Sequence, residues 1–299
     1  MEDLLVRAMG ADGAVLAFAT ITTKATEEAR RRHGTLPTAT AALGRALTAA
    51  AMLGAGLKGR QTVMVRVLGD GPLGPMIAES TADGAVRGYV TNPLTDLPPT
   101  PTRKLDVSGA VGRHGTFHVT RDLGLRDPYQ GSVPLVSGEI GEDLAAYLAG
   151  SEQVPSVVAV GVLVAPGGVR AAGGLMLQVM PGAPASVPRY LEERARALPP
   201  VTQMVTGGAT VDEMLAAALG ELSVSVLDRR PVRFACRCSA RKVAQVIVAL
   251  GRAEADRLLR EEGQVEVHCR FCGNRYAFGP EEVARVFAAG NDGEDADGP

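Results

Sequence analysis

Cys236-Arg237-Cys238 and Cys269-Arg270-Phe271-Cys272 contain all four cysteines of this 299-residue chain. Thirty residues separate the two pairs, and no cysteine precedes position 236. Two chelating pairs of sulfurs, one from each of two loops, match the ligand set of a tetrahedral zinc site. The spacing therefore predicts one zinc ion per chain, bound by Cys236, Cys238, Cys269 and Cys272, and a small module folded around it.

The two pairs differ in their spacers. Cys269-x-x-Cys272 is followed by Gly273, as in an ordinary zinc knuckle, where glycine lets backbone amides turn toward the sulfurs. Cys236-x-Cys238 has a one-residue spacer, which makes a tight chelate and could also close into a small, strained disulfide ring. This departure is the first indication that the site does more than hold a fold together.

Other interpretations of the cysteines remain open at this point. A purely structural zinc ribbon uses the same ligands. Two structural disulfides fit less well, because nothing marks the chain as secreted. A thioredoxin-like redox pair needs its C-x-x-C at the start of a helix, whereas residues 265–269 have the pattern of a strand. His268 could replace a sulfur, but with four cysteines present we expect it beside the ligands or in solvent.

The bulk composition bounds the class of protein. Hydrophobic residues make up 46% of the chain, which suits one large domain plus a small one. The net charge of −2 argues against nucleic-acid binding through the whole surface. The N-terminus begins Met1-Glu2-Asp3, and the longest apolar stretches are too short for a bilayer, so neither export nor membrane insertion is expected. We therefore expect a cytoplasmic protein, in a compartment where thiols stay reduced and bind zinc.

Residues 1–183 are predicted to form a strand-rich α+β domain. Asp83-Gly84 is a strong hairpin signal, and most of the predicted strands follow one another as hairpins with helices interposed irregularly. The predicted helices cover residues 38–58 and 139–149, and the predicted strands cover residues 62–68, 76–80, 85–91, 115–120, 157–164 and 174–180.

Gly69-x-Gly71-x-x-Gly74 has the spacing of a dinucleotide-binding fingerprint. Pro72 and the strand pattern that follows leave no helix to receive a pyrophosphate, so we interpret the motif as a turn. No Walker lysine motif occurs, and no catalytic grouping of Ser, His and Asp stands out. We therefore expect no cofactor-binding or catalytic residues and interpret the chain as a non-enzyme.

Residues 184–230 are predicted to be a helical linker. Pro181-Gly182-Ala183-Pro184 ends the first domain, and a helix over residues 186–198 stops at two prolines. A second helix begins with the capping-box pattern of Thr210 and Glu213. Its apolar stripe is predicted to cover the sheet of the first domain and consists of Val211, Met214, Leu215, Ala218, Leu219 and Leu222.

The zinc module is assigned to residues 231–290, followed by an acidic, disordered tail over residues 291–299. Ser239 is predicted to cap a helix that carries Val243, Val246, Ile247 and Leu250. Gly279-Pro280 opens a last helix with Val283, Val286 and Phe287 facing inward. Such a module has little core, so zinc is expected to supply much of its folding free energy, on the order of 10 kcal/mol.

With these features together, the chain resembles the redox-regulated heat-shock holdase family of bacteria, the thirty-three-kilodalton chaperonins. Both cysteine pairs match that family in order and spacing, and the likeness covers nearly the whole length. The matching stretches of the first domain include Gly71-Pro72-Leu73-Gly74, Arg87-Gly88-Tyr89-Val90-Thr91-Asn92-Pro93, Asp127-Pro128-Tyr129-Gln130-Gly131, Val136-Ser137-Gly138-Glu139-Ile140, Ser151-Glu152-Gln153-Val154-Pro155-Ser156 and Ala172-Gly173-Gly174-Leu175.

The resemblance implies an ATP-independent chaperone that is idle while reduced and zinc-bound. It implies that oxidant and heat convert the thiolates into two disulfides, Cys236–Cys238 and Cys269–Cys272. Zinc then leaves, the module and the linker unfold, and apolar surface binds unfolding client proteins. It also implies that the active form is a homodimer. The residue chemistry agrees, because each sulfur has a neighbour within reach that can resolve a sulfenic acid.

The main rival is a zinc-ribbon nucleic-acid binder. Residues 229–275 include eleven basic and five acidic residues, and this excess of positive charge could bind phosphates. Only Phe271 and Tyr276 lie near the knuckle as stacking residues, which is little for base recognition. We therefore expect no nucleic-acid partner, and an enzyme finds no support beyond the presence of a large folded domain.

Overall fold

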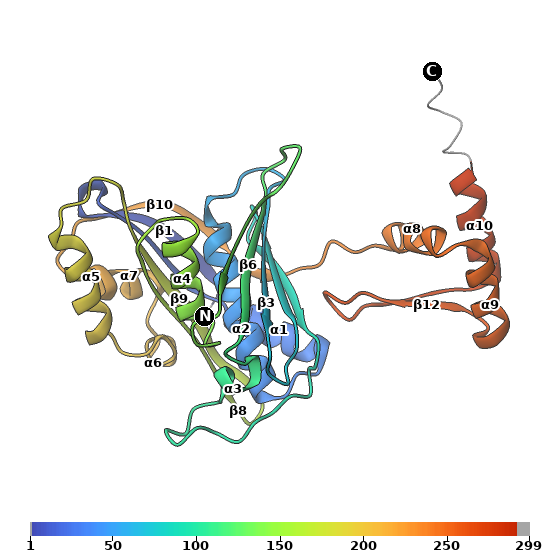
Figure 1. Ribbon diagram of the computed structural model, residues 1–299, viewed down its shortest axis with the longest axis horizontal. Helices are drawn as coiled ribbons and strands as arrows, with labels where there is room; N and C mark the ends of the chain where they lie inside the picture. Colours follow the sequence, from blue (N-terminus) through green and yellow to red (C-terminus); the bar gives the residue numbers. More distant parts are fainter. Residues whose placement is uncertain (1, 292–299) are drawn as a thin grey trace. The chain divides into compact units, whose positions relative to one another are not determined.

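The computed structural model describes residues 2–291, which fall into two compact units that divide between Ala235 and Cys236. Each unit has its own core. The fold is α+β, as predicted, with a strand-rich N-terminal unit, a linker that carries helices, and a C-terminal unit that holds all four cysteines (Figure 1).

The first sheet of the N-terminal unit contains strands from both ends of that unit. Its order is β10-β1-β2-β9-β8, and all neighbouring strands are antiparallel. The predicted strands at 157–164 and 174–180 are confirmed as parts of β8 and β9. The bounds of the five strands are β1 Leu4–Gly10, β2 Val15–Ile21, β8 Ser156–Ala165, β9 Gly168–Val179 and β10 Val224–Pro231.

The second sheet has the order β11-β5-β4-β3-β6-β7, in which only the short β11 pairs in parallel. The hairpin at Asp83-Gly84 is confirmed, and Gly69–Gly74 forms a turn between β3 and β4, not a dinucleotide loop. The bounds are β3 Thr62–Gly69, β4 Met76–Thr81, β5 Ala85–Val90, β6 Gly115–Asp122, β7 Tyr129–Pro134 and β11 Arg233–Phe234.

Helix α2 (Pro37–Leu53) packs against both sheets and forms the centre of the main core. It is buried along its whole length except at Pro37 and Arg45. Its alanines explain this position, because small side chains let a helix approach sheets closely on several sides. Three further helices complete this layer: α1 (Thr23–His33), α3 (Val107–Val111) and α4 (Gly141–Gly150).

The linker helices cover the opposite face of the first sheet and build a second core with it. They are α5 (Ser186–Ala197), α6 (Val201–Thr206) and α7 (Val211–Leu219) (Figure 1). The predicted capping box is confirmed, since Glu213 N–H donates to the Thr210 hydroxyl and Thr210 N–H donates to the Glu213 carboxylate. The apolar stripe of α7 is buried on the sheet, with Leu222 only partly covered.

The linker is not helical throughout. Val224–Pro231 forms strand β10, which pairs with β1 as an edge strand of the first sheet. The alternation of apolar and polar residues over Val224, Ser225 and Val226 is compatible with a strand. The pairing of this segment with β1 depends on the open edge of β1, which the local sequence does not show.

The C-terminal unit contains three helices and one hairpin among its described residues. They are α8 (Ala240–Leu250), α9 (Arg252–Glu262), α10 (Pro280–Asn291), and the β12–β13 hairpin (Val265–His268 and Arg275–Phe278). Ser239 caps α8 as predicted, but Val246 and Leu250 of that helix are exposed while Val243 and Ile247 are buried. The sequence did not indicate α9 or β13. Residues 292–299 of the expected acidic tail lie outside the described residues.

Among residues 2–291, no helix combines the length and the apolar composition that crossing a membrane requires.

Candidate metal centre

The fold brings the four cysteines into one cluster. Their sulfurs all lie within 4.8 Å of one another. The distance from Sγ of Cys236 to Sγ of Cys269 is 3.7 Å, and that from Cys238 to Cys272 is 3.4 Å. A zinc ion with Zn–S bonds of about 2.3 Å needs sulfurs about 3.8 Å apart at the corners of its tetrahedron. The spacing of the sulfurs thus fits a metal ion of this kind.

The second pair lies on a knuckle at the turn of the β12–β13 hairpin. Cys269 N–H donates to the carbonyl of Asn274 at 2.9 Å, and Gly273 N–H donates to the carbonyl of Cys269 at 2.8 Å. Gly273 has φ +71°, a left-handed conformation that a side chain would strain. The glycine after Cys272 therefore closes the turn that directs both sulfurs to the same side.

The first pair occupies extended chain between β11 and the start of α8. The hydroxyl of Ser239, next to Cys238, accepts from Lys242 N–H at 3.3 Å, and Lys242 Nζ donates to the carbonyl of Arg237 at 2.8 Å. The positive end of the α8 dipole and an ammonium group therefore lie beside the first pair.

Tyr276 is the contact that the sequence analysis missed. Its hydroxyl donates to Sγ of Cys238 at 3.0 Å, so it contacts one of the four clustered sulfurs. Tyr276 pairs with Val267 across the β12–β13 hairpin, and since the sequence did not indicate β13, no local signal pointed to this contact. His268 faces solvent, one of the two positions expected for it, and its Nε2 lies 2.5 Å from the Glu266 carboxylate.

The burial of the sulfurs opposes their ionisation. Burial is the main reason that the pKa values of Cys269 and Cys272 lie above the ordinary thiol value. A bound cation reverses this balance, because a coordinating thiol is deprotonated outright. Four sulfur donors suit a soft or borderline metal such as zinc. The donor set therefore fits a metal ion, and no disulfide joins these residues in the part of the chain that the structure describes.

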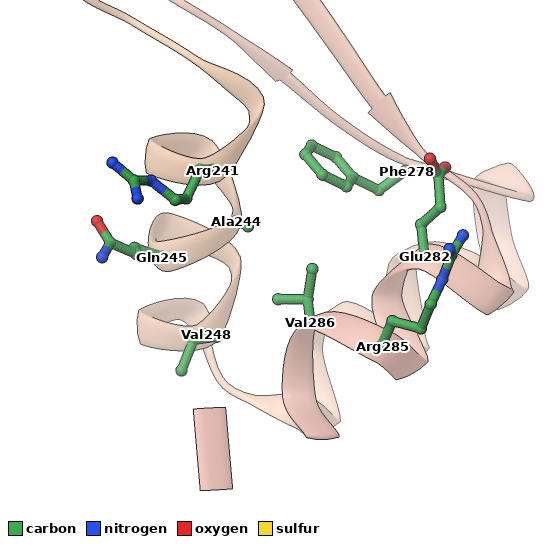
Figure 2. Close-up of a pocket in the computed structure, with 8 residues that line it drawn as sticks. All are labelled: Arg241, Ala244, Gln245, Val248, Phe278, Glu282, Arg285 and Val286. Atoms are coloured by element: carbon green, nitrogen blue, oxygen red, sulfur yellow. The ribbon is translucent and has the colours of Figure 1, made fainter. Parts of the chain in front are cut away.

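A separate groove lies between α8 and α10, in a cavity of about 620 Å³ that contains none of the cysteines. Figure 2 shows Ala244 and Val248 of α8 across the groove from Val286 of α10, with Phe278 at one end. Phe278 belongs to the small core of the unit and Ala244 and Val286 pack against that core, whereas Val248 is exposed. The groove thus lies at the border of that core.

The basic residues between positions 229 and 275 are partly paired with carboxylates. At least six of the eleven basic residues between 229 and 275 form ion pairs with carboxylates. Two of their partners, Asp83 and Asp212, come from distant parts of the sequence. A patch neutralised in this way offers less positive charge to phosphates than the count along the sequence indicated.

Comparison with known proteins agrees with the site. The family model described as Hsp33 protein matches residues 3–279. The 33 kDa chaperonins of Bacillus cytotoxicus and Bacillus cereus are each 46% identical over 287 residues, covering 96% of this chain and 99% of each relative. The crystal structure of the 33 kDa chaperonin (heat shock protein 33 homolog) of Thermotoga maritima matches with a TM-score of 0.91 and 35% identity, covering 98% of this chain and all of that one.

These relatives are named as chaperonins and not as enzymes, and the match extends through the segment that carries the four cysteines. With its sulfur cluster and the fold of a solved Hsp33 homolog, this chain belongs to the Hsp33 family of chaperones.

Proposed function

We propose that this chain is a redox-regulated, ATP-independent holdase, inactive when reduced and zinc-bound, which oxidation and heat convert into a form that binds unfolding proteins. The observation that carries the proposal is the gathering of four sulfurs in a unit that has little other core. Cys236, Cys238, Cys269 and Cys272 would bind one zinc ion, which when bound keeps their sulfurs deprotonated.

The chemistry of the switch follows from thiolates and a peroxide. One thiolate attacks hydrogen peroxide, the O–O bond breaks, and a sulfenic acid and hydroxide form. A neighbouring thiol then attacks the sulfenic sulfur, forming a disulfide and releasing water. Two such cycles consume two peroxides and oxidise four sulfurs, which then no longer serve as thiolate ligands.

We propose that the bridges join sequence neighbours, Cys236 to Cys238 and Cys269 to Cys272. Closing a short loop costs less chain entropy than closing one of more than thirty residues. Bridges of this kind leave α8, α9 and the hairpin untethered. Peptide mapping of the oxidised protein tests the pairing, and a dominant Cys238–Cys269 link would contradict it.

The energetics explain why such a local reaction unfolds a whole unit. Among the described residues of the C-terminal unit, six make up its buried hydrophobic core: Val243, Ile247, Ala255, Val265, Phe278 and Val283. Metal binding contributes on the order of 10 kcal/mol to small zinc modules. Since net domain stability is only about 5–15 kcal/mol, loss of the ligands removes most of what holds this unit folded.

The remaining parts of the proposal concern partners and location. We propose that clients are unfolding proteins, that the active form is a homodimer and that the protein works in the cytoplasm, as the family resemblance implies. We propose no catalytic activity and no nucleic-acid partner, and the ion pairing of the basic residues supports the latter.

The deciding experiment compares aggregation of a thermally unfolding protein in the presence of the reduced, zinc-loaded chain and of the peroxide-treated chain. We expect suppression only by the oxidised form and full reversal by a dithiol reductant. Equal suppression by both forms would contradict redox regulation. Salt-dependent binding to nucleic acid without suppression would favour the rival function.

A further inference from the structure

Strand β10 covers the edge of β1 while burying little of its own surface. Val224, Val226 and Leu227 are 44%, 43% and 46% exposed, and most of the remaining side chains of β10 also face solvent. A strand that contributes so little to a core is held mainly by its main chain. Figure 1 shows β10 lying along β1, at the outside of the sheet.

The main-chain pairing extends along the whole of β1. Residues Leu4 to Gly10 pair with Pro231 to Val224, interrupted by one bulge at which Leu227 has no partner. Val232 N–H donates to the carbonyl of Asp3 at 3.1 Å, and Ala11 N–H donates to the carbonyl of Ser223 at 3.1 Å. The N–H and C=O groups of successive residues point to alternate sides of an antiparallel strand. Those of Leu5, Arg7 and Met9 therefore also point toward β10.

Only a few side-chain contacts add to this pairing. Arg229 forms an ion pair with Asp212 of α7, and both side chains are about half exposed. Pro231 lies opposite Leu4, a position whose N–H would face away from β1, where a missing donor costs nothing. Arg230 adds a contact outside the sheet, since its guanidinium donates to the carbonyl of Ala82 at 2.7 Å. Apart from Arg229 and Arg230, β10 is held at the edge of β1 mainly through its main chain.

We propose that the edge of β1 is a client-binding site, which β10 occupies at rest and to which an extended segment of an unfolded polypeptide adds as a strand once β10 has left. This inference rests on the proposed function, since it identifies the surface that activation exposes. Strand addition suits a partner of unspecified sequence, because main-chain hydrogen bonds supply the affinity. Leu5 keeps its contacts with the main core and β2 stays paired with β1, so the template stays in place when the linker leaves.

Hydrogen exchange at single amides tests the site directly. We compare the reduced full-length chain, the peroxide-activated chain, and the activated chain bound to reduced, carboxymethylated α-lactalbumin, a permanently unfolded polypeptide. Protection of the Leu5, Arg7 and Met9 amides is expected to fall about tenfold or more on activation and to return in the complex. The amides of Val6 and Ala8 face β2 and should stay protected throughout, which makes them internal controls.

Two outcomes would overturn the inference. If the three amides stay protected after activation, β10 has not left the edge. If they stay exposed in the complex while aggregation is still suppressed, clients bind elsewhere, and the proposed function survives without this site. An activated chain that suppresses no aggregation contradicts the proposed function itself and removes the basis of the inference with it.

A matched pair of proline variants tests the occupancy of the edge by β10. Ser225 lies opposite Met9 and directs its N–H toward β1, whereas the N–H of the neighbouring Val224 faces away. Ser225→Pro should raise aggregation suppression by the reduced, zinc-loaded chain several-fold, and Val224→Pro should leave it unchanged. Both positions are exposed, so neither variant disturbs a core. Equal activity of the two variants would overturn the inference.

Discussion

At the scale of single residues, the cysteines combine two opposing demands. Burial raises the pKa of Cys272, whereas metal binding and oxidation both need its thiolate. The hairpin geometry, the start of α8 and the Tyr276 hydroxyl position the sulfurs in one cluster. A metal ion bound there would offset the effect of burial and keep the four sulfurs deprotonated.

Cys269→Ser should abolish high-affinity zinc binding. A serine hydroxyl is not a thiolate ligand, so the loss in affinity should exceed the roughly 10–100-fold that substitutions of outer contacts cost. Competition against a chromogenic chelator measures the change, with elemental analysis for stoichiometry. His268→Ala is the matched control, because that exposed side chain is adjacent in sequence and contacts Glu266 instead of a sulfur. Unchanged affinity in Cys269→Ser would refute the predicted ligand set.

At the scale of elements, α7 holds the linker on the sheet. Leu215 is buried in the second core, whereas Ala216, one position later, is exposed. Leu215→Glu places an unpaired charge in apolar surroundings at a cost of a few kcal/mol, so it should loosen the linker and raise chaperone activity without oxidant. Ala216→Glu adds the same charge on the same helix and should have no effect. If Leu215→Glu keeps its fold and zinc and stays inactive, α7 does not hold the resting state.

The ion pair between Asp212 and Arg229 connects α7 to β10 and makes their docking dependent on pH. Hydrogen bonding to the Arg229 guanidinium lowers the pKa of Asp212. Because the pKa of Asp212 is lower in the folded state, the ion pair adds its full stability at pH values above the unfolded pKa of about 3.9. This stability is lost as the pH falls through the folded pKa. Both side chains are about half exposed, so screening by solvent keeps the contribution of the pair small.

Docking should therefore be independent of pH near neutrality and weaken below about pH 4. Asp212→Asn removes the titrating group, so it should flatten that part of the pH profile and weaken docking slightly at pH 7. Exchange of the β10 amides as a function of pH provides the measurement. A wild-type profile that matches that of the variant would contradict the assignment.

At the scale of the whole molecule, the two units differ in what stabilises them. The N-terminal unit has two extensive hydrophobic cores, and the C-terminal unit has a small one beside the sulfur cluster. Chelation of zinc from the reduced chain should therefore unfold α8, α9 and α10 and leave α2 and both large sheets intact. Limited proteolysis should then cut first within residues 236–291.

Circular dichroism should show a partial loss of helix on chelation, and added zinc should restore it under reducing conditions. Cys269→Ser should resemble the chelated wild type even when zinc is present. A single cooperative loss of both units on chelation would contradict the prediction, because it would mean that the N-terminal unit depends on the metal as well.

Local signals in the sequence were sufficient to predict many elements of the fold. The spacing of the cysteines predicted the cluster, the Thr210–Glu213 pattern predicted the start of α7, and Asp83-Gly84 predicted a hairpin. Each of these signals lies within a few residues and acts through chain geometry or local hydrogen bonds. The predicted ligation of zinc and the disulfide pairing remain predictions, although the gathered sulfurs fit the former.

The tertiary structure alone decided the features that join distant segments. Strand β2 is almost completely buried and so lacks the alternation that reveals a strand, and β1 was not among the predicted strands either. The pairing of β10 with β1 brings Asp12 and Ser223 together across 211 positions, and the contact of Tyr276 with Cys238 crosses 38. Periodicity reports which face of a segment is buried, but strand partners and side-chain contacts depend on which edges and surfaces the rest of the fold leaves open.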